Sequence, residues 1–237
     1  VVLNAAGVEL MRIAGGMDLN QYATVLDTAL ADLQPADSLL NAAAAGQALD
    51  TGQCRRLAFN SWELDVDASA DAASNAALAR QLDAAAAHCP AGAQLERARL
   101  QIFAADYATR AEADALVKDL APTPLLRARL AAIDRVLADE RVARRIADAL
   151  QYLDADYFRA VKADGSASAA RLDRFSKLMD AAAADPNFST ADQLGAVGSK
   201  LAAIKIVKGA IPAGVARAAR ARVAATLAEE QIPYVRS

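Results

Sequence analysis

The chain has 237 residues, of which 55% are hydrophobic and 23% are charged, so it is long enough to bury one substantial core or two small ones. Alanine accounts for 64 of these residues and aromatic residues for only 5%, a helical composition that excludes an all-β fold. The net charge of −3 and the pI of about 5.3 provide no overall field that would attract nucleic acid.

The first predicted element, residues 1–13, lacks helical periodicity, and we interpret it as a linker or a strand from a preceding domain. The chain opens with Val1-Val2-Leu3-Asn4, which has neither an initiator methionine nor a signal peptide, and we expect a mature or excised piece. Residues 14–237 are expected to form an all-helical domain, in which only residues 59–66 also lack the helical pattern.

The first predicted helix covers residues 19–33. Its apolar residues recur at helical spacing and predict one buried stripe, made of Tyr22, Val25, Leu26, Ala29, Leu30 and Leu33. Asp18 is the expected N-cap, and Pro35 limits the far end. If this stripe is buried, Leu30→Ala leaves a cavity and costs about 2–5 kcal/mol of stability.

Similar stripes continue along the chain, separated by short turns that contain glycine or proline. The clearest are Leu126, Leu130, Ile133 and Leu137; Val142, Ile146, Leu150 and Leu153; Leu194, Val197, Leu201 and Ile204; and Val215, Val223 and Leu227. Short connections between about ten helices favour antiparallel neighbours, and no clean repeat period is present. We therefore predict an all-α fold, an irregular stack of antiparallel helical hairpins arranged as a bundle or as a HEAT-like solenoid.

The two cysteines, Cys54 and Cys89, form an even pair whose state the sequence leaves open. In an oxidising compartment they can close a disulfide, which favours a periplasmic or secreted location. Two buried free thiols are equally ordinary and would leave a cytoplasmic location open. The most apolar late stretch, residues 201–215, contains Lys205, Lys208 and Pro212, so we predict no membrane span.

Recognisable catalytic motifs are missing from the sequence. His88 is the only histidine, which removes any zinc site of the H-E-x-x-H type. His88 and Cys89 do not make a catalytic dyad, because neighbouring side chains on a helix point about 100° apart. We expect no catalytic residue, no metal ligand and no cofactor in this chain.

Three segments come close to ligand-binding motifs. The first has oxygen-bearing side chains at the alternating positions of a calcium loop: Asp65, Asp67, Ser69 and Asp71. Ala70 and Ala76 stand where that loop needs glycine and a bidentate carboxylate, so a cap for the next helix is favoured. Residues 195–200 have glycines too close together for a phosphate loop and continue a helical stripe. Asp154 and Asp156 lack the second aspartate cluster that isoprenoid-type magnesium chemistry needs.

The C-terminal part of the chain is locally basic. From Gln193 onward, two acidic residues, Glu229 and Glu230, stand against seven basic ones. The basic residues are Lys200, Lys205, Lys208, Arg217, Arg220, Arg222 and Arg236. Without interleaved aromatic residues for base stacking, this pattern is typical of a solvated face. The sharper alternative is a surface for an acidic partner or a peptide carboxylate.

The segment from Asn4 to Ile13 resembles the N-x-x-G-x-G-Y-Y-R-v segment that leads into the helical C-terminal domain of gluzincin-type zinc aminopeptidases, with Asn4, Gly7 and Arg12 matching in spacing. Residues 35–52 and 188–194 are similar to later parts of that domain. The resemblance implies a bowl of stacked helical hairpins that closes a peptide chamber, with a catalytic zinc domain upstream of Val1 and Arg12 on the substrate side. The partners would be that upstream domain or a peptide substrate.

Three functions remain open at this point. The first is the non-catalytic, chamber-closing domain that the resemblance implies. The second is a stand-alone exported all-α interaction or scaffold domain without enzymatic activity. The third is an all-α enzyme that binds a divalent metal through acidic residues such as Glu63, Asp65, Asp154 and Asp156. Trp62 can be a core anchor or an exposed contact, and we favour the core, because tryptophan is highly buried on average.

Overall fold

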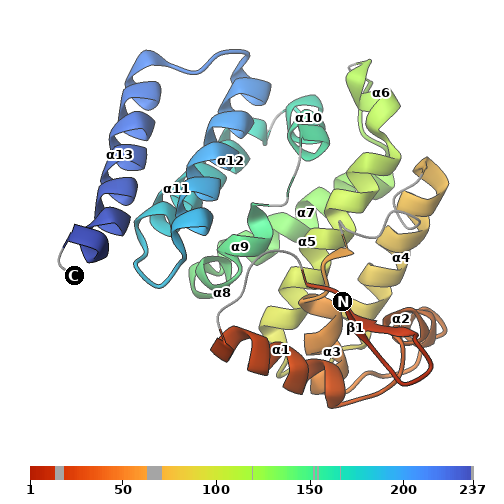
Figure 1. Ribbon diagram of the computed structural model, residues 1–237. Helices are drawn as coiled ribbons and strands as arrows, with labels where there is room; N and C mark the ends of the chain where they lie inside the picture. The colour runs from red at the N-terminus through yellow and green to blue at the C-terminus, as the bar shows by residue number, and fades with distance from the viewer. Residues whose placement is uncertain are drawn as a thin grey trace. The chain divides into compact units, whose positions relative to one another are not determined.

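The computed structural model describes residues 1–13, 19–62, 71–118, 120–151, 153, 155–165 and 167–235. Contacts between residues group into an N-terminal unit, Val1–Glu112, and a C-terminal unit, Ala113–Ser237. Apart from one small hairpin, the regular structure of the described residues is helical, which confirms the all-α prediction (Figure 1). None of the described helices is both long enough and apolar enough to cross a membrane.

The N-terminal unit consists of a β-hairpin followed by helices. Its elements are β1 (Val2–Leu3), β2 (Glu9–Met11), α1 (Leu19–Leu30), α2 (Ala36–Ala44), α3 (Thr51–Ala58), α4 (Ala72–His88) and α5 (Gln94–Ala111). Helices α4 and α5 form a long hairpin, against which α2 and α3 pack. Residues 1–13, expected as a linker or strand, belong to this unit.

The C-terminal unit is a second helical stack. Its elements are α6 (Ala113–Val117), α7 (Pro124–Ala138), α8 (Glu140–Arg145), α9 (Ala147–Leu150), α10 (Ala155–Ala163), α11 (Ser168–Ala184), α12 (Thr190–Lys208) and α13 (Ala213–Val235). Helix α12 packs against α10, α11 and α13 and so occupies the middle of this part of the unit. The successive pairs α11–α12 and α12–α13 are helical hairpins of the predicted kind (Figure 1).

The hairpin turn explains two residues of the opening segment. The Asn4 side-chain Oδ1 accepts hydrogen bonds from the backbone N–H groups of Ala6 and Val8, at 3.0 and 2.9 Å. Gly7 has a φ of +75°, a left-handed conformation that glycine adopts without steric cost. Asn4 and Gly7 therefore shape the turn that pairs β1 with β2 in antiparallel register.

Local side chains set several helix boundaries. Asp50 and Gln53 form a capping box at the start of α3, each side chain bonding the other residue's backbone N–H. Asp71 accepts from the Ser74 N–H at 2.7 Å and begins α4, as expected for a cap in place of a calcium ligand. Helix α12 ends at Gly209, whose φ of +79° is the left-handed C-cap conformation.

The buried stripe predicted for the first helix is wrong in part. Helix α1 ends at Leu30 instead of residue 33, and Tyr22, Leu30 and Leu33 are 50%, 54% and 60% exposed. Ala29 is fully buried, because α1 packs through that side against α3 and β2. Leu30 lies about 100° further around the helix and points to solvent. The prediction that Leu30→Ala costs about 2–5 kcal/mol of stability is therefore wrong, because the side chain is not buried.

Each unit has its own core. In the N-terminal unit Trp62 is 1% exposed and donates from its indole N–H to the Leu57 carbonyl at 3.0 Å, so it is a core residue. In the C-terminal unit the Phe158 ring contacts Tyr157 and Phe175 edge to face, with centroids 5.2 and 4.9 Å apart. These four aromatic residues are at most 3% exposed and belong to the cores of the two units.

Candidate functional site

Arg12 ties the hairpin to the end of α3. Its backbone N–H donates to the Asn60 side chain and its carbonyl accepts from the Ser61 N–H, both at 2.7 Å. Its guanidinium donates from Nε and Nη2 to the two carboxylate oxygens of Glu9, at 2.9 and 2.6 Å. Two donors of the Arg12 guanidinium therefore bind Glu9 of β2. The predicted role of Arg12 toward a substrate stays a prediction.

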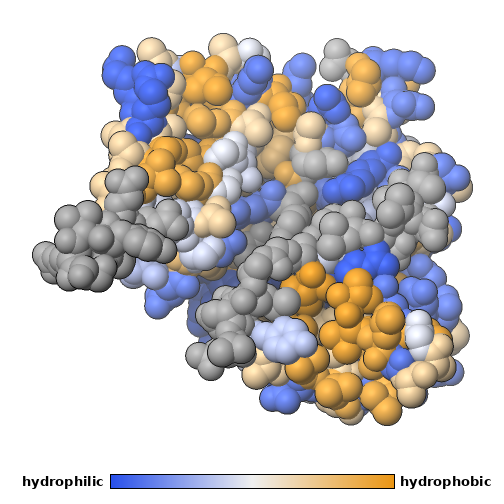
Figure 2. All heavy atoms as spheres, viewed as in Figure 1, coloured by the Kyte–Doolittle hydropathy of each residue, from blue (hydrophilic) through white to orange (hydrophobic). Residues whose placement is uncertain are grey.

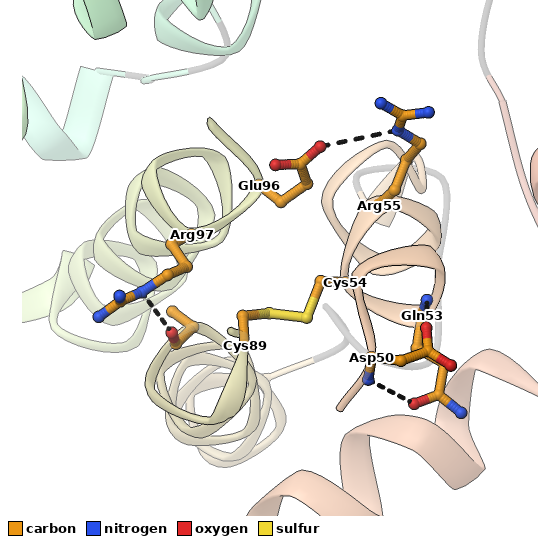
Figure 3. Close-up of a disulfide and its surroundings, with 8 residues drawn as sticks. Asp50, Gln53, Cys54, Arg55, Cys89, Glu96 and Arg97 are labelled. Atoms are coloured by element: carbon orange, nitrogen blue, oxygen red, sulfur yellow. Dashed lines mark hydrogen bonds and ion pairs between the residues drawn. A yellow bond between two sulfur atoms is a disulfide. The ribbon is translucent and has the colours of Figure 1, made fainter. Parts of the chain in front are cut away.

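The structure joins Cys54 and Cys89 in a disulfide (Figure 3). Cys54 lies on α3 and Cys89 is the C-cap that follows α4, and they are 0% and 5% exposed. The Leu49 N–H donates to the His88 carbonyl at 3.1 Å beside it. The bond therefore fixes α3 to the C-terminal end of α4 inside the core, and His88 is the last residue of that helix.

Charged residues surround this disulfide. Glu96 of α5, whose side chain is 10% exposed, lies 3.6 Å from Arg55 Nε of α3, while Arg97 donates to the Ala86 carbonyl at 3.2 Å (Figure 3). These contacts connect α5 to each of the two helices that the disulfide joins. They make the junction of α3, α4 and α5 a structural centre of the N-terminal unit.

Arg56 is the most deeply buried charge of the N-terminal unit. Its exposure is 0%, Nη1 donates to the Asp32 carbonyl, and among the described residues Nε and Nη2 have no acceptor. Burial lowers the pKa of Arg56, and the nearby Asp32 and Asp50 carboxylates act in the opposite direction. Burial would also raise the pKa of Asp32, but hydrogen bonds from Gln53 and Gln34 and the charge of Arg56 leave it lowered overall.

Of the four acidic residues proposed for a metal, only Asp156 belongs to the described parts of the chain. Glu63, Asp65 and Asp154 lie outside the described residues, as do Asp18, Asp67 and Ser69. Asp156 forms an ion pair with Arg159. Within the described ranges, no group of three histidine, cysteine or carboxylate side chains is placed to hold a metal ion. Residues 195–200 lie within α12, so the phosphate-loop pattern there is helical, as the sequence indicated.

A candidate site of the C-terminal unit is an open groove between α6, α10 and α12, which we name the basic groove. Its volume is about 530 Å³, within the range of roughly 300–1,000 Å³ typical of ligand sites. Its apolar lining includes Leu116, Val117, Ala202 and Ile206. Figure 2 shows hydrophobic and hydrophilic side chains next to one another over the ends of α10 and α12.

Three cations line the basic groove. Arg159 and Lys162 lie on one side of α10, three residues apart, and Lys205 lies on the facing side of α12. Arg159 is oriented by its ion pair with Asp156. Lys205 is exposed and forms no ion pair in the described part of the chain. Among its described lining residues, the groove thus combines an apolar wall with three cationic side chains, of which Arg159 is already paired with Asp156.

The sequence indicated only one of the three cations that line this groove. The basic C-terminal part contains Lys205, and an acidic partner was one reading of that pattern. It did not indicate Arg159 or Lys162, which lie more than 40 residues earlier in the chain. The spacing of these two residues on one helix face was the available signal, but only the packing of α10 on α12 brings them to Lys205. The chain has no match among protein-family models, curated proteins or solved structures.

Proposed function

We propose that the chain is a helical interaction domain that binds an acidic peptide segment of a partner protein in the basic groove. The observation that carries this proposal is the placement of Arg159, Lys162 and Lys205 around an apolar wall. Carboxylates of the segment would pair with these cations, while its apolar side chains would contact Val117 and Ile206. Opposite charge raises the rate of encounter, and burial of apolar surface supplies affinity.

The disulfide supports a periplasmic or secreted location for this domain. A bond between Cys54 and Cys89 persists in oxidising compartments and is rare in the reducing cytoplasm. The location is tested by isolating the protein from its native source with free thiols alkylated during lysis. Two alkylated cysteines in the mature protein would contradict an extracytoplasmic location.

Binding is tested with fluorescent peptides that contain alternating Glu and Leu, and with matched peptides in which Lys replaces Glu. The wild-type chain is expected to bind the acidic set, with an affinity that falls as salt is raised. The variant Lys162→Glu/Lys205→Glu should lose about tenfold or more of that affinity, since two favourable charges become unfavourable. Equal binding of acidic and basic peptides would contradict the proposal.

A matched control is available on α11. Lys177 is 75% exposed, pairs at the surface with Asp173 and lies outside the basic groove. The variant Lys177→Glu/Arg217→Glu, in which Arg217 is exposed on α13 and outside the lining of the groove, makes the same change in net charge as the groove variant and should bind almost as the wild type does. If it loses as much affinity as the groove variant, the effect comes from total charge and the groove is not the binding site.

The resemblance to aminopeptidase C-terminal domains supports a second proposal. In that case the same helical stack would close the peptide chamber of a larger protein. The support is the match at Asn4, Gly7 and Arg12, of which the first two form the hairpin turn here. The coding sequence upstream of Val1 tests it: a zinc-peptidase domain with H-E-x-x-H is expected, and its absence would exclude this role.

A further inference from the structure

A second, smaller cleft lies between α11, α12 and α13, in the same unit but away from the lining of the basic groove; we name it the α13 cleft. Its volume is about 130 Å³. Its walls include Val197, Leu201, Val215 and Ala219. For comparison, an apolar protein cavity of roughly 150 Å³ holds one benzene molecule. The α13 cleft is therefore of the size that accommodates one small ring or a short branched chain.

Among the described residues that line the α13 cleft, one positive charge has no counter-charge. Lys200 Nζ lies 2.7 and 2.6 Å from the two carboxylate oxygens of Asp180, so these two lining residues neutralise each other. Arg222, on α13, is the remaining charged residue of the lining. A ligand that matches this balance carries a single negative charge.

Arg222 also has an unused donor. Its Nη2 is 3.4 Å from Gln193 Oε1, which accepts from Thr226 as well, at 3.5 Å. Its Nε is buried and has no acceptor among the described residues. A buried donor without a partner costs about 1–3 kcal/mol, and a carboxylate oxygen is an acceptor that would satisfy it with a charge-assisted hydrogen bond.

We propose that the α13 cleft binds a small monocarboxylate whose carboxylate pairs with Arg222 and whose apolar group lies against Val197, Leu201 and Val215. The charge follows from the uncompensated guanidinium, and the size follows from the volume of the cleft. Because all three helices line the cleft, such a ligand would also link α13 to α11 and α12. This site is independent of peptide binding in the basic groove.

The proposal is tested by calorimetric titration of the full chain with benzoate and with isovalerate, in a buffer free of other carboxylates. Both acids are expected to bind, whereas benzamide, which has the same ring without the charge, should bind at least about tenfold more weakly. Hydrogen exchange at α13 amides should slow when benzoate is bound. Failure of both acids to bind would overturn the proposal, and so would equal affinities for benzoate and benzamide.

Two variants locate the site. Arg222→Met keeps most of the aliphatic stem and should abolish benzoate binding, while Arg220→Met, at an exposed position of the same helix, should leave it unchanged. Ala219→Leu places a larger side chain in the lining and should block benzoate even if Arg222→Met disturbs the packing of α13. If benzoate binds both Arg222→Met and Ala219→Leu with wild-type affinity, the ligand lies elsewhere and the proposal fails.

Discussion

Removal of the disulfide is expected to destabilise the N-terminal unit strongly. Cys54 and Cys89 are 35 residues apart in sequence. For a closed loop of that size, the chain-entropy relation gives a loss of about 13 cal/mol/K in the unfolded state, or about 4 kcal/mol at 25 °C. Proteins of ordinary stability unfold with about 5–15 kcal/mol, so this loss is a large fraction of the total.

Trp62 provides an assay that is specific for this unit. It is the only tryptophan, it is 1% exposed, and it bonds to Leu57 of α3, the helix that contains Cys54. Urea unfolding followed by its fluorescence is expected to give a midpoint that falls when dithiothreitol is added. The double variant Cys54→Ala/Cys89→Ala should be similarly destabilised and should not respond to the reductant.

The refuting result is defined by the same experiment. If reduction changes the free energy of unfolding by less than about 1 kcal/mol, the bond does not restrict the unfolded chain as the relation requires. A reductant effect of equal size on the double alanine variant would show that the reagent acts on something other than the Cys54–Cys89 bond.

Three further predictions concern stability. Leu30→Ala should cost under about 1 kcal/mol because Leu30 is 54% exposed, while Leu57→Ala at a fully buried position should cost about 2–5 kcal/mol. Both costs are measured by urea unfolding, and equal costs would contradict the exposed position of Leu30 on α1. The folded-state pKa of Asp32 is lowered below 3.8, so its contribution to stability is complete above that pH and is lost as the pH falls through the folded value. Asp32→Asn should therefore flatten the fall of stability in acid, and an unchanged pH profile would refute this. Asp71→Ala removes the α4 cap and should cost about 1 kcal/mol, with Asp71→Asn retaining most of the stability.

Local sequence was sufficient for the helical class and for several helix ends. Alanine content and apolar spacing predicted helices, and the structure confirms them. The preference for a cap at Asp71 over a calcium loop also came from neighbouring positions, since the missing glycine and carboxylate are at Ala70 and Ala76. Capping and periodicity act within a few residues, which is why the sequence alone determines them.

Other features were decided by contacts between segments that are far apart in the chain. The apolar pattern of α1 does not say which neighbour covers it, and packing against α3 and β2 buries Ala29 but not Leu30. Whether Cys54 meets Cys89 depends on α3 lying beside the end of α4. Lys205 joins Arg159 only because α12 packs on α10. Helix formation is a short-range property of the sequence, whereas the disulfide and both proposed ligand sites depend on which helix faces meet in the tertiary structure.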